Sequence, residues 1–211
     1  MKIISTNTAQ PSSIQWQGEV RTTGIYKTPQ TEGIYLSPEG VRDDIVGNPK
    51  VHGGAMKAAY LFSQDQYPYW QAAYPHLEWN YGMFGENLTV EGLDETSLKM
   101  GNIYKIGQAK VRITTPREPC FKLGIRFSDQ EIIQKFVAHG YPGSYVEVLE
   151  SGWVRPGDSM ELIYTAESGI SIAEFFNLWY ARVKDQGLLK EAMLIPWLSE
   201  EKRNRLMQWI K

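Results

Sequence analysis

The chain has 211 residues, one cysteine (Cys120) and a formal net charge of -2 at pH 7. This length suits one domain, or one domain with a small appendage, because domains usually span ~100–200 residues. A single cysteine excludes an intramolecular disulfide, a four-cysteine zinc site and a CxxC redox pair within this chain. The near-neutral charge gives no electrostatic reason to expect a nucleic-acid polymer or a membrane surface as partner.

The sequence shows no targeting or membrane-spanning segment. The first residues, MKIISTNTAQPSS, do not contain the ~7–15 apolar residues of a signal-peptide core. No run approaches the ~20 apolar residues of a membrane helix. We therefore expect a cytoplasmic protein whose thiol is reduced.

Residues 1–166 are predicted to be mainly β. Short segments rich in β-branched or aromatic residues are bounded by Gly, Pro, Asn or Asp, which is typical of strands joined by turns. Their spacing favours a barrel or folded sheet over alternating βαβ units. The predicted strands are residues 2–5, 24–26, 33–36, 87–90, 103–106, 110–114, 144–149 and 160–164.

Helical insertions are predicted within this β region. Residues 54–62 and 64–73 are expected to form one or two helices. A further helix is predicted over residues 129–139, where Ser128 and Glu131 have the spacing of a capping box. Its apolar residues recur at intervals of three and four, which predicts one buried face.

The character of the sequence changes at residues 167–211, which are predicted to form a small three-helix subdomain. Ser171 and Glu174 have the capping-box spacing at the start of the first helix. Gly187 and Pro196 then separate two short helices, at residues 188–194 and 199–210. The charged residues in LYARVKDQ and EEKRNR are expected on solvated helix faces, and the short linker predicts that this subdomain touches the domain of residues 1–166.

The segment TPREPCFKLG, residues 115–124, has the strongest chemical signal. Prolines on the approach to Cys120 predict a constrained, non-helical backbone. Arg117 and Lys122 lie close to Cys120 in sequence, and nearby cations favour the thiolate, which is the nucleophilic and metal-binding form. The residues alone leave a reactive thiol and a buried structural cysteine about equally supported.

A second segment, VHGGAMK, is compatible with anion binding. Gly53 and Gly54 allow close approach of backbone to a ligand, and Lys57 follows three residues later. The residues alone favour a tight loop with a hydrogen-bonded His52. Neither GxGxxG nor GxxxxGK is present, so ordinary dinucleotide or Walker-type phosphate binding is not supported.

Two further features have ordinary structural interpretations. Residues 81–88, YGMFGENL, could shape a pocket wall, but the two glycines favour a β-turn that leads into a strand. Lys27, in GIYKTP, would ordinarily be a surface lysine.

The order of these segments nevertheless resembles that of one family. GIYKTP, VHGG, FGENL, GNIYKIG, PREPCFKL and WVRPGD follow one another as in the MOSC domain, the C-terminal domain of molybdenum cofactor sulfurase, which also occurs as stand-alone bacterial proteins. The resemblance extends over essentially the whole chain. It implies a mainly β fold, a MOSC-type β-barrel with helical insertions, and the last three helices resemble the small domain that follows the barrel in one bacterial subgroup.

In that subgroup the resemblance implies molybdenum-dependent reduction of N-hydroxylated compounds such as hydroxylaminopurine bases, which serves detoxification. It implies molybdenum cofactor as cofactor, a small N-hydroxylated substrate and a separate electron-donating reductase. By position, Cys120 would be the catalytic residue and the molybdenum ligand. The implied cofactor-binding residues are Lys27, His52, Gly53, Gly54, Lys57, Asn87, Arg117 and Lys122.

The chain also departs from the family pattern. The loop before VHGG contains Asp43 and Asp44 in a different arrangement, and Met56 replaces a residue that is usually acidic. Glu147 stands where the family tends to have an arginine, which removes one candidate cation for the cofactor phosphate.

Three other functions remain open at this point. A sulfur carrier would use a persulfide on Cys120 without molybdenum, stabilised by the same basic loop. A non-catalytic cofactor carrier would bind the pterin without turning over a substrate. A β-barrel that binds single-stranded nucleic acid is the remote option, because the charge of -2 argues against an extended basic surface.

Overall fold

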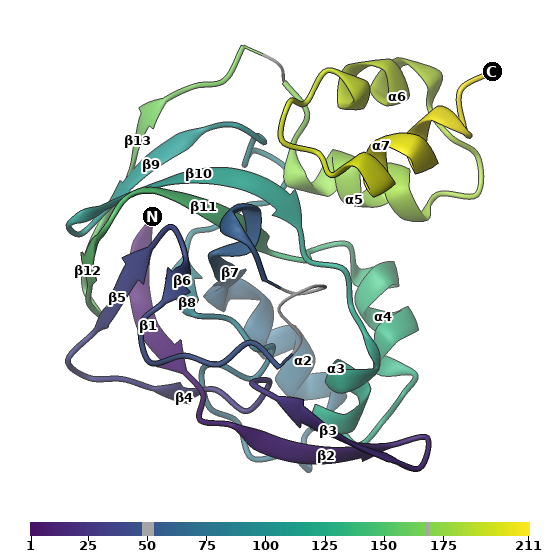
Figure 1. The fold of residues 1–211 in the computed structure, drawn as a ribbon. Coiled ribbons are helices and arrows are strands. Elements are labelled where there is room, and N and C mark those ends of the chain that lie inside the picture. Colours follow the sequence, from purple (N-terminus) through teal and green to yellow (C-terminus); the bar gives the residue numbers. More distant parts are fainter. Residues whose placement is uncertain (48–52, 168) are drawn as a thin grey trace.

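The fold is described from a computed structural model, in which residues 1–47, 53–167 and 169–211 are placed well enough to describe (Figure 1). The strands are β1 Lys2–Thr8, β2 Ser12–Trp16, β3 Glu19–Thr23, β4 Thr28–Pro29, β5 Ile34–Ser37, β6 Gly40–Val41, β7 Ala59–Ser63, β8 Leu88–Glu91, β9 Ile103–Ile106, β10 Ala109–Pro116, β11 Ser144–Glu150, β12 Gly152–Val154 and β13 Met160–Tyr164. The helices are the 3-10 turns η1 Ala55–Lys57 and η2 Gln64–Gln66, and the α-helices α2 Tyr67–Ala73, α3 Phe121–Arg126, α4 Ile132–His139, α5 Ile172–Tyr180, α6 Gln186–Met193 and α7 Glu200–Met207.

The predicted mainly β fold is confirmed. Among the described residues, the largest sheet has the strand order β13-β9-β10-β11-β7-β8-β1-β4, in which β7 and β8 are parallel and the other neighbours antiparallel. The sheet curls until β1 meets the chain before β13. There the backbone N–H of Ile3 donates to the carbonyl of Asp158 at 2.9 Å, and the N–H of Gly157 donates to the carbonyl of Ile3 at 2.8 Å. These bonds close the barrel and satisfy backbone groups that an open edge would expose.

Strand β10 shows why the predicted strands form. Val111 and Ile113 are fully buried, whereas Lys110 and Arg112 point to the outer face. The outward cations pair with the residues opposite them on β11: Lys110 with Glu150 at 2.6 Å and Arg112 with Glu147 at 2.8 Å. One face of β10 therefore packs in the core, and the other is held to β11 by cross-strand ion pairs.

The helix predicted over residues 54–62 is wrong. Only the 3-10 turn Ala55–Lys57 forms there, and it is followed by strand β7, whose five residues are all buried. Strand β7 lies between β11 and β8 in the interior of the sheet. A strand buried on both faces has no alternation of polar and apolar residues, so its sequence is easily mistaken for a buried helix.

The N-terminal β2–β3 hairpin was not predicted, and no strand forms at residues 24–26. The turn of the hairpin is Gln17-Gly18, and both residues have positive φ, as a two-residue hairpin turn requires. The ring of Trp16 on β2 stacks on Phe121, the residue after Cys120, with centroids 4.7 Å apart. The hairpin thus covers one side of the cysteine segment.

The capping box predicted at Ser128 and Glu131 is also wrong. Ser128 has φ 53, a left-handed conformation that an N-cap does not adopt, and α4 begins at Ile132. Asp129 accepts from the backbone N–H of Glu131 at 2.8 Å instead. The capping box of Ser171 and Glu174 at the start of α5, in contrast, is confirmed by both of its hydrogen bonds.

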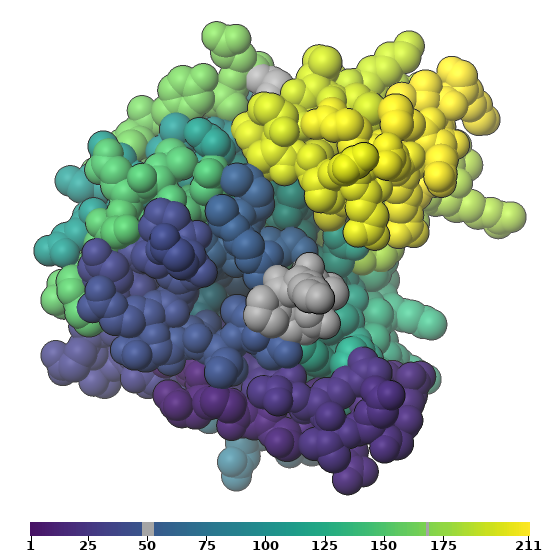
Figure 2. All heavy atoms as spheres, viewed as in Figure 1, coloured from purple at the N-terminus to yellow at the C-terminus, as the bar shows by residue number. Residues whose placement is uncertain are grey.

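The helices α5, α6 and α7 form a lobe that packs on the barrel at β10 (Figures 1 and 2). Their buried residues, among them Phe175, Leu178 and Leu206, belong to the same apolar cluster as the barrel residues Val111 and Ile113. The predicted contact between the two parts of the chain is therefore present. None of the helices in the described ranges is long and apolar enough to cross a bilayer.

The many aromatic residues form a second cluster. Trp70 of α2, Phe136 of α4 and Phe84 of the loop before β8 are fully buried together with Phe62 of β7. Phe62 and Phe84 stack with ring centroids 4.1 Å apart. This cluster fixes α2 and α4 against one side of β7 and thereby positions the loops that surround Cys120.

Candidate functional site

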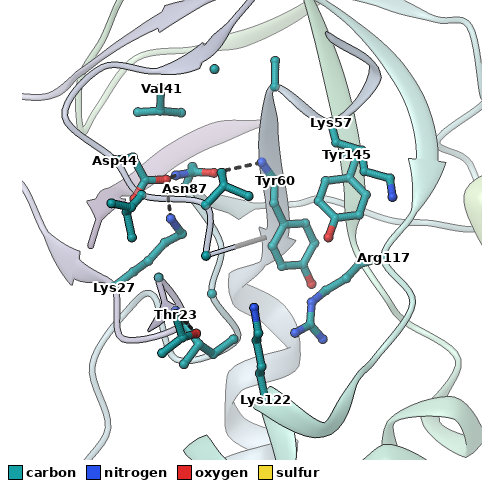
Figure 3. Close-up of a pocket in the computed structure, with 18 of the residues that line it drawn as sticks. Thr23, Lys27, Val41, Asp44, Lys57, Tyr60, Asn87, Arg117, Lys122 and Tyr145 are labelled. Atoms are coloured by element: carbon teal, nitrogen blue, oxygen red, sulfur yellow. Dashed lines mark hydrogen bonds and ion pairs between the residues drawn. The ribbon is translucent and has the colours of Figure 1, made fainter. Parts of the chain in front are cut away.

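The predicted site residues gather around a cavity of about 150 Å³ at one end of the barrel (Figure 3). The walls come from the segments after β3 and β6, from β7, from the loop before β8 and from the segment between β10 and α3. Segments that are distant in sequence therefore meet here. The predicted residues that line this cavity are Lys27, Lys57, Asn87, Arg117, Cys120 and Lys122.

Gly53 and Gly54 lie on a second cavity, on the other side of Cys120. Gly54 has φ 97 and precedes the 3-10 turn η1, so a glycine is required by the backbone at this position. The remaining predicted site residue, His52, lies outside the described residues.

Cys120 is a free, half-buried thiol that lines both cavities. Its backbone is extended, with φ -134 and ψ 171, and it is the residue immediately before α3. The preceding prolines, Pro116 and Pro119, keep this segment out of the helix. The thiol therefore lies where the two cavities meet, and a small molecule in either cavity can approach it.

Arg117 is buried, and its guanidinium carbon lies 5.5 Å from the ring centre of Tyr60 and 5.5 Å from that of Phe136. Its Nη1 is buried without a hydrogen-bond partner, and among the described residues no carboxylate pairs with it. Burial opposes its charge, but the neighbouring Tyr60, Tyr145 and Cys120 side chains outweigh that effect and raise the pKa of Arg117. A buried cation without a counterion favours an anion beside it.

Two lysines add positive charge near Cys120. Lys122 of α3 is 8% exposed, and in Figure 3 its amine points to the same part of the cavity as Arg117. Burial lowers the pKa of Lys122, an effect that Cys120 opposes. The amine of Lys57 lies 5.6 Å from the ring centre of Tyr145, and burial followed by repulsion from Lys202 lowers the pKa of Lys57. An anion in the cavity would stabilise the charged form of both amines.

Lys27 is not the surface lysine that its sequence context suggests, because it is only 6% exposed and forms an ion pair with Asp44. Asp44 also accepts from the side chain of Asn87 and from the backbone of Ala9, each at 2.8 Å. The side-chain oxygen of Asn87 accepts from the backbone N–H of Tyr60 at 3.2 Å (Figure 3). Lys27 and Asn87 thus form part of the cavity wall, and Asp44, which is not among the predicted site residues, holds them together.

The turn expected at residues 81–88 is present, with positive φ at Gly82 and Gly85 and a 2.9 Å bond from the N–H of Gly85 to the carbonyl of Gly82. The buried carboxylate of Glu86 accepts from the N–H groups of Gly82 at 2.8 Å and Phe84 at 3.1 Å. Glu86 also accepts from the hydroxyl of Tyr67. The carboxylate shapes this turn, which places Asn87 on the cavity.

Two tyrosines of the site that are not among the predicted site residues form a pair. Tyr60 of β7 and Tyr145 of β11 are directly opposite each other in the sheet, with ring centroids 5.4 Å apart. The hydroxyl of Tyr60 donates to the carbonyl of Pro142 at 2.8 Å. Tyr145 lines both cavities. Only the strand pairing brings these residues together, so no local sequence signal could have indicated it.

Glu147, which stands where the family tends to have an arginine, lies away from the cavity. Its ion pair with Arg112 is on the outer face of β10 and β11. The cations that surround the cavity come instead from other segments.

The second cavity, of about 690 Å³, lies between Cys120 and the C-terminal helices. Glu118 forms an ion pair across it with Lys202 of α7, whose side chain is 14% exposed. The expectation that the charges of EEKRNR are all solvated is therefore wrong for Lys202. It is also wrong for Arg203, which donates to the carbonyl of Ile195 at 2.8 Å.

The comparisons with known proteins identify the family of this chain. The model of the MOSC domain matches residues 48–161, which include the cysteine segment and most of the barrel. This chain belongs to the MOSC domain family. It is 32% identical to YflK of Bacillus subtilis, described as an uncharacterized protein, over 98% of this chain and 93% of that protein.

Two further similarities concern function and fold. A protein of Gibberella moniliformis named "Reductase" is 30% identical over 85% of this chain, but the match spans only 32% of that protein. The crystal structure of YiiM from Geobacillus stearothermophilus has a TM-score of 0.82 and 26% sequence identity, and it covers 100% of this chain and 99% of its own. The shared fold therefore includes the C-terminal helices as well as the MOSC barrel.

Proposed function

We propose that this MOSC protein binds molybdenum cofactor and reduces N-hydroxylated compounds, such as hydroxylaminopurine bases, to the corresponding amines. The observation that carries the proposal is the buried Arg117, whose Nη1 has no hydrogen-bond partner among the described residues, with Cys120 and Lys122 on the same cavity. These groups suit a ligand that is both anionic and able to take a thiolate at a soft metal.

The residues present fit the cofactor in their chemical types. Cys120 would supply the thiolate ligand to molybdenum, and Arg117, Lys122 and Lys57 would hold the anionic pterin phosphate. Lys27 already has Asp44 as its partner, so its role is to position the wall of the cavity. When bound, the cofactor supplies the two-electron redox chemistry, and the protein supplies binding and orientation.

The proposed reaction breaks the N–O bond of the hydroxylamino group. Two electrons and two protons are consumed, the nitrogen becomes the amine, and the oxygen leaves as water. The electrons come from a separate reductase. The family membership and the relative named "Reductase" support this assignment at the level of the reaction class.

Molybdenum analysis tests the proposal. Protein made in a molybdenum-replete host should contain near-stoichiometric molybdenum in the wild type and background amounts in Cys120→Ser, because the serine hydroxyl is a poor ligand for a soft metal. Arg117→Met should lose most of the bound cofactor, whereas Lys105→Met, at an exposed position on β9, should retain it.

The same samples distinguish the other functions. Stoichiometric molybdenum in Cys120→Ser would overturn the thiolate assignment. A wild-type mass increase of one sulfur atom on Cys120, without molybdenum, would identify a sulfur carrier. Molybdenum-loaded protein that fails to reduce hydroxylaminopurine with a reductase chain would identify a cofactor carrier.

A further inference from the structure

The cavity at the end of the barrel is small for a cofactor site. It measures about 150 Å³, whereas small-molecule sites usually span ~300–1,000 Å³. Arg117 and Lys122 line this cavity and do not line the larger one. An anionic group of cofactor size therefore reaches these two cations only if a wall of the barrel cavity moves.

Most walls of this cavity are tied firmly to the barrel. Strand β7 lies in the interior of the large sheet. Asp44 holds Lys27 through an ion pair and Asn87 through a hydrogen bond. The exception is the wall formed by residues 23–25, because it is the root of the β2–β3 hairpin.

The β2–β3 hairpin is a two-stranded sheet of its own. Within the part of the chain that the structure describes, no hydrogen bond joins residues 13–22 to the barrel. Four of the five residues of β3 are exposed. A hairpin of two strands is at best marginally stable in water by itself, so contacts with side chains of the barrel hold this hairpin in place.

Phe121 provides the main contact of this kind. The ring of Trp16 stacks on Phe121 with the two planes 21° apart, and the guanidinium carbon of Arg21 lies 5.6 Å from the same ring centre. Burial lowers the pKa of Lys122, Cys120 opposes this shift, and repulsion from Arg21 adds to it. The hairpin therefore lies beside α3 and covers the side of the cavity where Lys122 lies (Figure 1).

We propose that the β2–β3 hairpin is a lid over the barrel cavity. It opens as a unit when the stack of Trp16 on Phe121 breaks, and it then admits an anionic ligand to Arg117 and Lys122. The negative charge of the bound ligand offsets the repulsion between Arg21 and Lys122, so binding favours the closed lid. The nature of the ligand rests on the proposed function, whereas the motion belongs to the protein without ligand.

Hydrogen exchange measured by mass spectrometry tests whether the hairpin opens by itself. In the wild type, residues 12–23 should exchange through local opening, well before β10, because few contacts have to break. Trp16→Leu should speed this exchange about two- to tenfold, the factor that corresponds to one stacked aromatic pair. Trp153→Leu is the matched control and should leave the hairpin unchanged. Trp153 is also half-buried and packs on the ring of Tyr35, 5.7 Å away, but it lines neither cavity.

Access to the cavity is tested by acetylation with sulfosuccinimidyl acetate, followed by peptide mass spectrometry. Lys122 is only 8% exposed, so its acetylation should rise in Trp16→Leu by about the same factor as the exchange of the hairpin. Two other lysines in the same sample are controls and should react as in the wild type. They are Lys105, exposed on β9, and Lys202, which lines the larger cavity.

A second variant loosens the hairpin without touching Phe121. Gly18 has φ 81 in the hairpin turn, and a side chain there would meet no atom within 4 Å. Gly18→Val therefore strains only the backbone of the turn, because a β-branched residue disfavours positive φ. It should also raise the acetylation of Lys122 and leave that of Lys202 unchanged.

The outcomes separate the lid from the proposed function. Hairpin protection equal to that of β10, or unchanged acetylation of Lys122 in both hairpin variants, overturns the lid. Equal increases at Lys122 and Lys202 also overturn it, because the whole molecule would then have loosened. Thermal unfolding confirms that each variant is folded. Background molybdenum in the wild type, together with the expected exchange and acetylation, contradicts the cofactor and supports the lid.

Discussion

Asp44 holds one wall of the cavity through a single carboxylate. It pairs with Lys27 and accepts hydrogen bonds from Asn87 and Ala9, and its side chain is 5% exposed. Burial lowers the pKa of Lys27, and the attraction of Asp44 opposes that shift. A buried cation that loses its partner is strongly destabilising, because the desolvation of the charge is no longer compensated.

Asp44→Asn should therefore reduce the free energy of unfolding by about 3–5 kcal/mol at pH 7. Chemical denaturation followed by circular dichroism measures the change. The neighbouring Asp43 is exposed, and its positive φ is compatible with asparagine, so Asp43→Asn should have little effect. Equal losses for the two variants would show that the buried ion pair is not the cause.

At the scale of elements, the buried Glu95 joins the loop after β8 to the residue before β11 and to α5. Glu95 Oε1 accepts from the N–H of Gly143 at 3.0 Å, and the Glu95 carbonyl accepts from the N–H of Ala173 at 3.0 Å. Glu95 Oε2 is buried, and no described residue forms a hydrogen bond with it. Burial raises the pKa of Glu95 to about 7 and so favours the protonated carboxyl, although the hydrogen bond from Gly143 opposes this shift.

The stability of the protein should consequently depend on the pH through Glu95. Between the ordinary pKa of 4.5 and about 7, the folded state binds more protons at this site than the unfolded state, so stability falls as the pH rises. Glu95→Gln should remove this pH dependence, which changes the free energy of unfolding by up to about 1.4 kcal/mol for each unit of the pKa shift. At pH 8 the variant should therefore be more stable than the wild type. Unfolding curves from pH 4 to pH 8 measure it, with Glu91→Gln, exposed on β8, as control.

At the scale of the whole molecule, the C-terminal lobe and the barrel share one apolar cluster. The contacts between them include the bond from Trp197 to Thr114 and the ion pair of Lys202 with Glu118. The division into residues 1–166 and 167–211 remains a prediction about chain organisation. The shared core implies that neither part keeps its buried surface covered when the other unfolds.

We expect a single cooperative unfolding transition. Hydrogen exchange measured by mass spectrometry at increasing denaturant should show α5 and β10 losing protection together, because their side chains pack in one core. Earlier loss of protection throughout α5, α6 and α7 would instead identify an independently unfolding unit.

Much of the fold could be predicted from local sequence patterns. The β-branched residues of segment 110–114 predicted a strand that is part of β10, and the spacing of Ser171 and Glu174 predicted the start of α5, because both signals depend on neighbours within a few residues. The same reasoning failed at β7, where burial on both faces removes the alternation, and at Ser128, whose left-handed backbone excludes the predicted cap.

The sequence by itself determined the mainly β class, the order of motifs that marks the MOSC family, and the residue types of the candidate site. Only the tertiary structure decided how these residues are paired. Lys27 meets Asp44, Tyr60 lies opposite Tyr145, and Arg117 has no carboxylate partner within the described ranges. The physical reason is that local patterns report propensity and periodicity, whereas burial of a charge and the shape of a cavity depend on segments that are distant in sequence and meet only when the chain folds.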